Sequence, residues 1–221
     1  MVNEVKTHID KYKAFFFDFD GVVVDSVNVK TDAFAEIYKP YGKKVVSQVI
    51  SHHISHGGIS RYEKFRYYHR NFLNKQISEA EVEELAQRFS DLIIQKVIKA
   101  PFISGAPEFL ELVKTKNKKL FVISATPENE IKEIVKQKNL TQYFTDIKGS
   151  PLKKDKNLKF LIDRYDLKIS ECLYFGDSEQ DLNAAASLNI AFVPINYYDG
   201  TKGYSNFSNL IGEFKQLKEM R

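Results

Sequence analysis

The chain has 221 residues, of which 43% are hydrophobic, and carries a formal charge of +4 with an isoelectric point near 8.9. This composition excludes a disordered chain, and no apolar stretch is long enough to cross a bilayer. The charge suits anionic small molecules but is too slight to indicate a nucleic-acid partner. Because the N-terminal residues lack the apolar segment of a signal peptide, we expect a soluble cytoplasmic protein with no membrane partner and no obligate protein partner.

Short apolar runs along the chain predict five β-strands. They cover residues 14–19, 119–124, 146–149, 172–176 and 190–195. Most are separated by segments with helical periodicity, an alternation that predicts an α/β fold with a parallel sheet and helices on both faces. One of these helices is expected to begin with Thr126 as its N-cap and Pro127 at its first position.

The first connection is much longer than the others. About 100 residues separate the first strand from the second, whereas a crossover needs only a dozen or more. Periodicity in this segment predicts four helices: from Asp25 or Ser26 through Tyr38, over 45–54, over 62–73, and from a capping box at Ser78. We therefore expect a helical cap domain at 26–99, inserted in a core domain of 1–25 and 100–221, with hinges near Asp25 and 101–105.

Two aspartates end the first apolar run. Asp18 and Asp20 are separated by the single residue Phe19, and Gly21 follows Asp20. Side chains alternate along a strand, so both carboxylates are expected on one side. Carboxylates held this close repel each other unless a proton or a cation lies with them, and a divalent ion is the usual remedy. The pair indicates chemistry that needs both a metal and a nucleophile.

Four motifs in order resemble those of the haloacid dehalogenase superfamily. They are the segment 18–22 (Asp-Phe-Asp-Gly-Val), Ser124, the pair Lys153 and Lys154, and the segment 176–178 (Gly-Asp-Ser) with Asp181. The order and spacing resemble the branch of phosphatases and β-phosphoglucomutases that carries a helical cap. This resemblance implies a doubly wound, five-stranded parallel sheet in the order 3-2-1-4-5 with an inserted all-α cap.

The resemblance also implies roles for the acidic residues. Asp18 is the expected nucleophile, which forms an aspartyl-phosphate, and Asp20 is the expected general acid and base. Asp18, the backbone carbonyl of Asp20, and Asp177 are the expected ligands of Mg²⁺. Asp181 is expected to support the metal site and the lysine, and it also fits the first turn of a helix capped by Ser178.

The remaining core motifs are expected to bind phosphate. The Ser124 hydroxyl and the Ala125 amide are expected to donate to phosphate oxygens at a helix N-terminus. The alternative is that these residues form a Ser-x-Thr capping turn. By resemblance to relatives with a Gly-Ser-Pro lead, Lys154 is the expected catalytic lysine. Lys153 is the alternative candidate for the catalytic lysine.

Two residues of the insertion are candidates for substrate binding. Arg61 ends the segment 57–61, which resembles the cap loop of β-phosphoglucomutases, and its guanidinium could bind a second anionic group or be an ordinary surface residue. Lys30 stands where those mutases carry a histidine, and this difference favours hydrolysis over isomerisation.

Two other patterns in the insertion have simple explanations. His52, His53 and His56 are spaced so that only two share a helix face, with no acid beside them, and we expect solvated or cap-loop side chains rather than a metal site. The basic and aromatic run at 66–70 is reminiscent of nucleic-acid contacts, but helical periodicity accounts for it.

Together these features predict a Mg²⁺-dependent phosphatase that acts on a small phosphorylated metabolite through an aspartyl-phosphate. The second aspartate argues for phosphoryl transfer, because the dehalogenase branch lacks it. The alternative is a sugar-phosphate mutase of the β-phosphoglucomutase type. A third possibility is a non-catalytic module that binds an anionic partner.

Overall fold

The structure, a computed structural model, describes residues 9–195, 206–208, 210 and 211. Its centre is a five-stranded parallel sheet in the order β3-β2-β1-β4-β5. The strands are β1 Ala14–Phe17, β2 Lys119–Pro127, β3 Asp146–Ser150, β4 Cys172–Gly176 and β5 Ala191–Pro194. The predicted fold class and strand order are confirmed.

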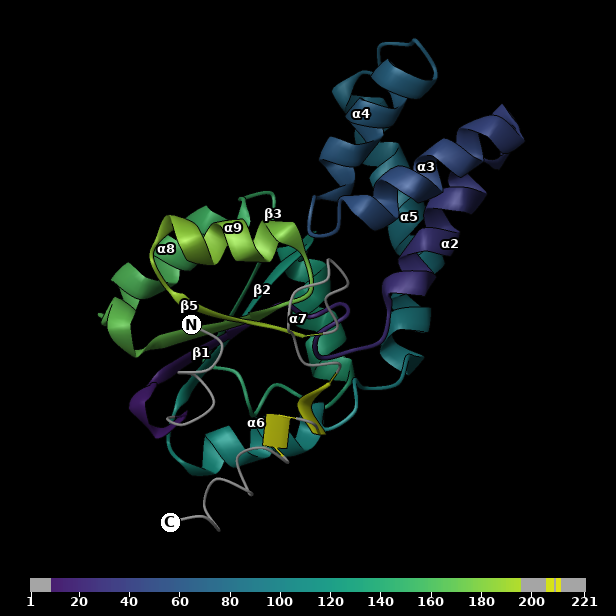
Figure 1. The fold of residues 1–221 in the computed structure, drawn as a ribbon. Helices are drawn as coiled ribbons and strands as arrows, with labels where there is room; N and C mark the ends of the chain where they lie inside the picture. Colours follow the sequence, from purple (N-terminus) through teal and green to yellow (C-terminus); the bar gives the residue numbers. More distant parts are fainter. Residues whose placement is uncertain (1–8, 196–205, 209, 212–221) are drawn as a thin grey trace.

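Helices cover both faces of this sheet (Figure 1). The core helices are α6 Ala106–Thr115, α7 Glu128–Gln137, α8 Lys154–Arg164 and α9 Glu179–Ser187. Alternate residues of β1 enter different cores: Phe16 packs with apolar residues of α8 and α9, whereas Phe15 and Phe17 pack with those of α6 and α7. The nearly continuous apolar sequence of β1 is explained by this burial on both faces.

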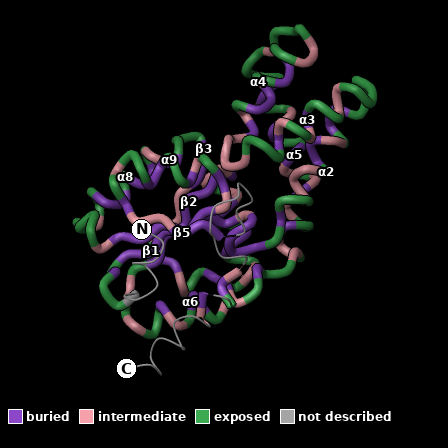
Figure 2. The backbone as a smooth tube through the Cα atoms, viewed as in Figure 1, coloured by how far each residue is buried: buried purple, intermediate pink, exposed green. Residues whose placement is uncertain are grey.

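Four helices lie to one side of the sheet domain in Figure 1. They are α2 Val27–Tyr38, α3 Lys43–Ser55, α4 Arg61–Phe72 and α5 Glu79–Lys99, and the short helices η1 Ile9–Lys11, η2 Lys39–Tyr41 and η3 Ile169–Glu171 complete the order. Figure 2 shows the buried residues concentrated in the sheet and along parts of the cap helices. We refer to α2–α5 as the cap.

The two connections between cap and sheet domain run side by side. Val24 forms an antiparallel bridge with Phe102, and the Asp25 N–H donates to the Pro101 carbonyl at 2.9 Å. Both connections thus leave the sheet domain at one place, where the sequence predicts hinges. The exact domain boundaries at 25 and 100 stay a prediction.

The predicted start of α7 is wrong. Strand β2 continues through Pro127, and the helix begins at Glu128 rather than after a Thr126 cap. The Thr126 hydroxyl is instead within hydrogen-bonding distance of Asp20 and Lys30, at 3.3 and 2.8 Å. A contact from a distant segment therefore overrides the local capping signal.

The interior of the cap is aromatic but contains one lysine. Phe34, Phe65 and Phe89 pack against one another, with ring centroids 4.5 to 6.2 Å apart. Lys64 is 2% exposed and lies 2.7 Å from His53 Nδ1. The expectation of solvated or cap-loop histidines is therefore wrong for His53, which lies within α3 and is buried because it packs on Phe34 and accepts a hydrogen bond from Lys64.

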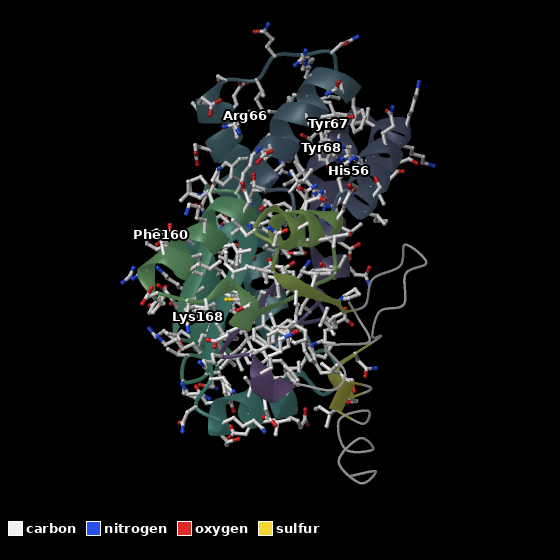
Figure 3. The ribbon with its side chains drawn as sticks, turned by 60° about the vertical axis from the view of Figure 1, so that its left-hand side comes forward. His56, Arg66, Tyr67, Tyr68, Phe160 and Lys168 are labelled. Carbon is white, nitrogen blue, oxygen red and sulfur yellow. The ribbon has the colours of Figure 1, made fainter. Side chains whose placement is uncertain are left out.

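The run at 66–70 behaves as its helical periodicity predicts. Tyr68 is buried and Arg70 is exposed. Figure 3 shows Tyr67 and Tyr68 near His56 in the cap. The His52 ring stacks on the rings of both Tyr67 and His56. These aromatic rings thus contact one another within the cap, and Tyr67 also remains 41% exposed.

No helix among the described residues has the length and apolar character needed to traverse a lipid bilayer.

Lys64→Met should raise the free energy of unfolding, because it removes a buried ammonium group that has no carboxylate partner among the residues that the structure describes. The pKa of Lys64 is lowered from 10.5 to about 7, first by burial and then by the charges of Lys30 and Lys154. The folded wild type therefore binds fewer protons than the unfolded chain between these values, and its stability rises with pH across that window. The advantage of the variant, about 1.4 kcal/mol for each pKa unit, should be largest below pH 7 and shrink as the pH rises.

Urea unfolding of both proteins at about pH 6 and about pH 9.5 measures this difference. The exposed Lys44 of α3 supplies a matched control, since Lys44→Met should change little at either pH. An advantage of Lys64→Met that grows with pH would contradict the assignment of a buried charge.

Candidate active site

The pairing of β1 with β4 brings Asp18 and Asp177 together. In this register Phe17 lies beside Phe175, so each aspartate follows the end of its strand at the same edge of the sheet. The Asp18 N–H extends the pairing by donating to the Phe175 carbonyl at 2.9 Å. Carboxylate oxygens of Asp18, Asp177 and Asp181 lie within 4.8 Å of one another, close enough for one ion to contact several of them.

Lys154 is the lysine of this cluster. Its ammonium lies 2.9 Å from Asp18 Oδ2 and 2.6 Å from Asp181 Oδ1, and the side chain is 5% exposed. Lys153 is exposed and occupies the N-cap position of α8. The structure therefore brings Lys154, rather than Lys153, to the expected nucleophile.

Asp181 is held by a complete set of donors. Lys154 and the Tyr174 hydroxyl bind its Oδ1 at 2.6 and 2.7 Å, and the Ser178 hydroxyl and N–H bind its Oδ2. Ser178 and Asp181 also form the capping box of α9. Both expected roles of Asp181 are thus compatible with the structure, since it caps a helix and orients Lys154.

Burial raises the pKa values of two acids in the cluster. The pKa of Asp18 is raised to about 7, chiefly by desolvation, with repulsion from Asp181 and Asp20 adding to the effect and Lys154 opposing it. The pKa of Asp177 is raised well above its usual value, again by burial first and then by Asp18 and Asp181. A cation among these oxygens would relieve the repulsion that raises both values.

Asp20 lies in a different electrostatic environment. Its carboxylate accepts hydrogen bonds from Ser26, at 2.6 Å, and from Lys30 and Thr126. Burial alone would raise the pKa of Asp20, but the Lys30 ammonium and these hydrogen bonds hold it below its usual range. Ser26 is at the N-cap position of α2 without capping its backbone, because its hydroxyl is directed to Asp20.

Lys30 is therefore the cap residue that reaches the acids of the core. It comes from α2, and its ammonium bridges Asp20 and Thr126. The sequence singled out Lys30 as a substrate-binding candidate but gave no sign of Ser26 or Thr126 as partners of Asp20. The contact between Thr126 and Asp20 is seen only in the folded structure, since the two residues are over 100 positions apart in the sequence.

Ser124 and Ala125 lie within β2, just before Thr126, whose hydroxyl contacts Asp20. Ser124 is 1% exposed, and its Oγ accepts the N–H of Thr126 at 3.1 Å, the turn expected as the simpler explanation. The hydroxyl hydrogen of Ser124 is not used in that bond. Ala125 and Lys154 line a pocket of about 430 Å³ between the cap loop and the core.

Arg61 is engaged away from the acidic cluster. Its guanidinium binds both carboxylate oxygens of Glu130 on α7, at 2.6 and 2.9 Å, and the Ser90 hydroxyl at 2.6 Å. It also lies over the ring of Phe89, 4.5 Å from the centroid. In this structure Arg61 joins the cap to the core, and its expected contact with substrate stays a prediction.

The donor set fits a hard divalent cation such as Mg²⁺. The cluster supplies carboxylate oxygens and no thiolate or imidazole. Among the described residues Asp177 accepts no hydrogen bond, so its oxygens keep their full capacity as ligands, whereas those of Asp181 are already satisfied. Asp18 and Asp177 are therefore the side chains that would hold the ion.

The fold and this site define a class of protein. Acidic side chains at the carboxyl ends of adjacent parallel strands, where the strand order reverses, are typical of an α/β enzyme with its crevice at the topological switch point. The family model of haloacid dehalogenase-like hydrolases matches residues 15–195. The chain belongs to this family, which confirms the resemblance noted in the sequence and the expectation of a hydrolase.

Similar proteins include two curated phosphatases and a solved mutase. The chain is 25% identical over 222 residues to the phosphoglycolate phosphatase of Photobacterium profundum, with 93% of each chain covered. It is 26% identical over 192 residues to the phosphorylated carbohydrates phosphatase of Thermotoga maritima, covering 80% of this chain and 82% of that one. The crystal structure of β-phosphoglucomutase from Clostridium difficile aligns with a TM-score of 0.74 at 20% identity, covering 95% of this chain and all (100%) of the other, and shows the shared fold.

Gly21→Ala should destabilise the protein by displacing Asp177. Gly21 has a φ of +83°, and an added Cβ would lie 2.0 Å from Asp177 Oδ2. Gly42 is a matched control, since its φ is +87° but an added Cβ would have nothing within 4 Å. Gly42→Ala should cost about 1 to 3 kcal/mol for its backbone alone, since φ +87° with ψ 165° is a conformation essentially restricted to glycine, and Gly21→Ala should cost at least about 1 kcal/mol more for the added clash.

The free energies of unfolding in urea measure both losses. Equal losses in the two variants would mean that Asp177 is free to move away from Gly21.

Proposed function

We propose that the chain is a Mg²⁺-dependent phosphatase that hydrolyses a small phosphorylated metabolite through an aspartyl-phosphate on Asp18. The observation that carries this proposal is the contact of Asp18 with Lys154 beside Asp177, with Asp20 nearby on a separate hydrogen-bond network. The family and the phosphatase names of its curated relatives support the same reaction class. Together they favour a phosphoric monoester as the substrate.

In the first step an Asp18 oxygen attacks phosphorus, and the bond from phosphorus to the leaving oxygen breaks. Asp20 donates its proton to that oxygen, so the alcohol leaves neutral. A bound phosphate adds negative charge beside Asp20 and competes for Lys30, and both effects raise the pKa of Asp20 towards the protonated form. Lys154 offsets the charge of the attacking carboxylate and of the phosphoryl oxygens.

In the second step water attacks the phosphorus of the aspartyl-phosphate. Asp20, now ionised, accepts a proton from the water, and the bond between Asp18 and phosphorus breaks to give inorganic phosphate. The hydrogen bonds to Asp20 from Lys30, Ser26 and Thr126 stabilise this ionised form. The Ser124 hydroxyl and the Ala125 N–H are the proposed donors to the phosphoryl oxygens.

Mg²⁺, when bound by Asp18 and Asp177 with the Asp20 carbonyl, would neutralise charge on the phosphoryl group. The excess of carboxylates over ammonium groups in the cluster supports a cation there. Asp181 acts indirectly, by holding Lys154 in place.

The mutase alternative is not favoured. The similarity to a β-phosphoglucomutase is a similarity of fold at 20% identity, whereas the curated relatives described above are named as phosphatases. Isomerisation of a hexose 1-phosphate with little net hydrolysis would nevertheless establish it.

Asp18→Asn should abolish phosphate release, by at least about a thousandfold in kcat, because an amide is a poor nucleophile and a poor ligand. Release of inorganic phosphate from a panel of sugar, nucleotide and polyol phosphates, with Mg²⁺ and with EDTA, measures this. Asp25→Asn is the matched control, since Asp25 is exposed in the same connection and should keep wild-type activity. Activity that survives in Asp18→Asn, or that EDTA leaves unchanged, would overturn the proposal.

Lys154→Met and Lys153→Met should separate the two neighbouring lysines. The first variant should lose about a hundredfold or more in kcat/KM, because a buried charge partner of the nucleophile is removed. The second should stay within about twofold of wild type, because Lys153 is a surface residue. Steady-state phosphate release from the best substrate of the panel measures both, and the opposite order would exchange their roles.

A further inference from the structure

One lysine of the core ends the longest helix of the cap. Lys138 occupies the C-cap position of α7, and its ammonium donates to the carbonyls of Ile98 and Ala100 at 3.0 and 2.8 Å. Ile98 lies in the last turn of α5, and Ala100 is the C-cap of that helix. The last carbonyls of a helix have no partner within it and carry the negative end of its dipole, so a cation is favourable there. The core thus supplies the group that satisfies this end of the cap.

The same lysine contacts the connection that returns from the cap to the core. Its ammonium lies 4.4 Å from the centroid of the Phe102 ring, within the range of a cation–π contact. Lys138 therefore contacts the chain on both sides of Pro101, from the last turn of α5 to the first residues beyond the helix. We call residues 98–102 the return segment. Lys138 holds this segment from the side of α7.

The return segment pairs with the chain that leaves the core for the cap. Three backbone contacts join the two connections side by side: the antiparallel bridge of Val24 with Phe102, the bond from the Asp25 N–H to the Pro101 carbonyl at 2.9 Å, and the bond from the Ile103 N–H to the Val23 carbonyl at 3.0 Å. Together they make a short ladder. A shift of the return segment would therefore move residues 23–25 or break these bonds.

The outgoing chain in turn closes the turn that carries Asp20. Val24 bridges Asp20, and the Val24 carbonyl accepts the N–H of Gly21 at 2.8 Å. The same carbonyl accepts the N–H of Ser26 at 3.0 Å, and the Ser26 hydroxyl binds the Asp20 carboxylate at 2.6 Å. Val24 therefore supports both the backbone of the acid and one of its side-chain partners. Phe102 of the return segment is bridged to Val24 as well.

We propose that Lys138 is a positioning residue for Asp20. Lys138 holds the return segment, the return segment holds Val24, and Val24 holds the acid where it can give its proton to the leaving oxygen. This proton transfer depends closely on geometry, because a displacement of about 1 Å can cost about a hundredfold in rate. The inference rests on the proposed phosphatase function and extends its machinery to a residue that acts through the backbone of both connections.

The contacts of α7 show how Lys138 can be replaced without undocking the cap. Glu130, about two turns before Lys138 on this helix, also binds the cap through Arg61 and through the Ser90 hydroxyl, each at 2.6 Å. Lys138→Met should therefore free the return segment while this second contact persists. Lys138→Arg keeps donors for the two carbonyls, and the exposed Lys136 in the last turn of α7 supplies the control Lys136→Met.

Leaving groups of different basicity test the inference. An alkoxide leaves readily only with a proton from the acid, whereas p-nitrophenolate is a weak base that needs little protonation. The readout is kcat/KM for p-nitrophenyl phosphate and for the alkyl phosphate that the wild type hydrolyses best among glycerol 3-phosphate, glucose 6-phosphate and 2-phosphoglycolate. This constant reports the steps up to departure of the leaving group, so hydrolysis of the aspartyl-phosphate does not enter it.

Lys138→Met should lower kcat/KM for the alkyl phosphate about tenfold or more, which is part of the roughly 100- to 10,000-fold that general acid catalysis supplies, and for p-nitrophenyl phosphate less than about threefold. Lys138→Arg should restore most of the loss, and Lys136→Met should change neither constant. In an Asp20→Asn background the acid is already lost. Adding Lys138→Met there should have little further effect on either substrate, because the two changes act on one step.

Several outcomes separate the inference from the function on which it rests. An equal loss for both substrates, or a loss that persists in the Asp20→Asn background, would overturn the inference, because Lys138 would then act only through the stability of the fold. A Lys138→Met variant as active as the wild type toward the alkyl phosphate would overturn it too. Release of phosphate by the wild type from none of these substrates, p-nitrophenyl phosphate included, would overturn the phosphatase function itself. If Lys138→Met fails to fold, Lys138→Gln and Phe102→Leu weaken the same contacts and should show the same selective loss.

Discussion

The site depends on the parallel pairing of β1 with β4, which forces acidic side chains together in a buried place. Because β1 and β4 are paired in parallel, the residues that follow them lie at the same edge of the sheet. The carboxylates of Asp18 and Asp177 are therefore held close together. Their mutual repulsion and burial work against folding, and the surrounding groups reduce that cost. Lys154 bridges Asp18 and Asp181, while Tyr174 and Ser178 fix Asp181 in turn. The sheet thus supplies a concentrated negative charge that a magnesium ion is suited to neutralise.

The cap completes this arrangement from the other side. The Lys30 side chain extends from α2 to bind Asp20. As a result, the pKa values of Asp18 and Asp20 are shifted in opposite directions, although only Phe19 separates them in the sequence. Burial raises the pKa of Asp18, whereas contacts with Lys30, Ser26 and Thr126 lower that of Asp20. Such a separation suits the assignment of different chemical tasks to two similar groups. The catalytic machinery that we propose is therefore shared between the sheet domain and the cap.

The sequence was sufficient where function depends on strand ends and on order along the chain. The helical insertion could be predicted from the length of the first connection. The sheet order and the choice of Asp18, Asp177 and Lys154 followed from the resemblance of the ordered motifs to a known family, with Lys153 left as an alternative. The environment of Thr126, His53 and Lys64 could not, since it depends on how cap helices pack on each other and on the core. Thr126 shows the limit most directly: its local signal predicted a helix cap, and a lysine about 100 residues away in the sequence overrides it.

The Arg61 pairing with Glu130 has a consequence for how the cap is held on the core. Both side chains are nearly inaccessible to solvent, at 4% and 8% exposure, and they connect α4 of the cap to α7 of the core. Swinging these helices apart would break a strong contact, but it would also let water hydrate two groups that are now dry. Hydration of the separated charges would offset part of the lost interaction energy, so the pair fixes the orientation of α4 on α7 more than it strengthens their association.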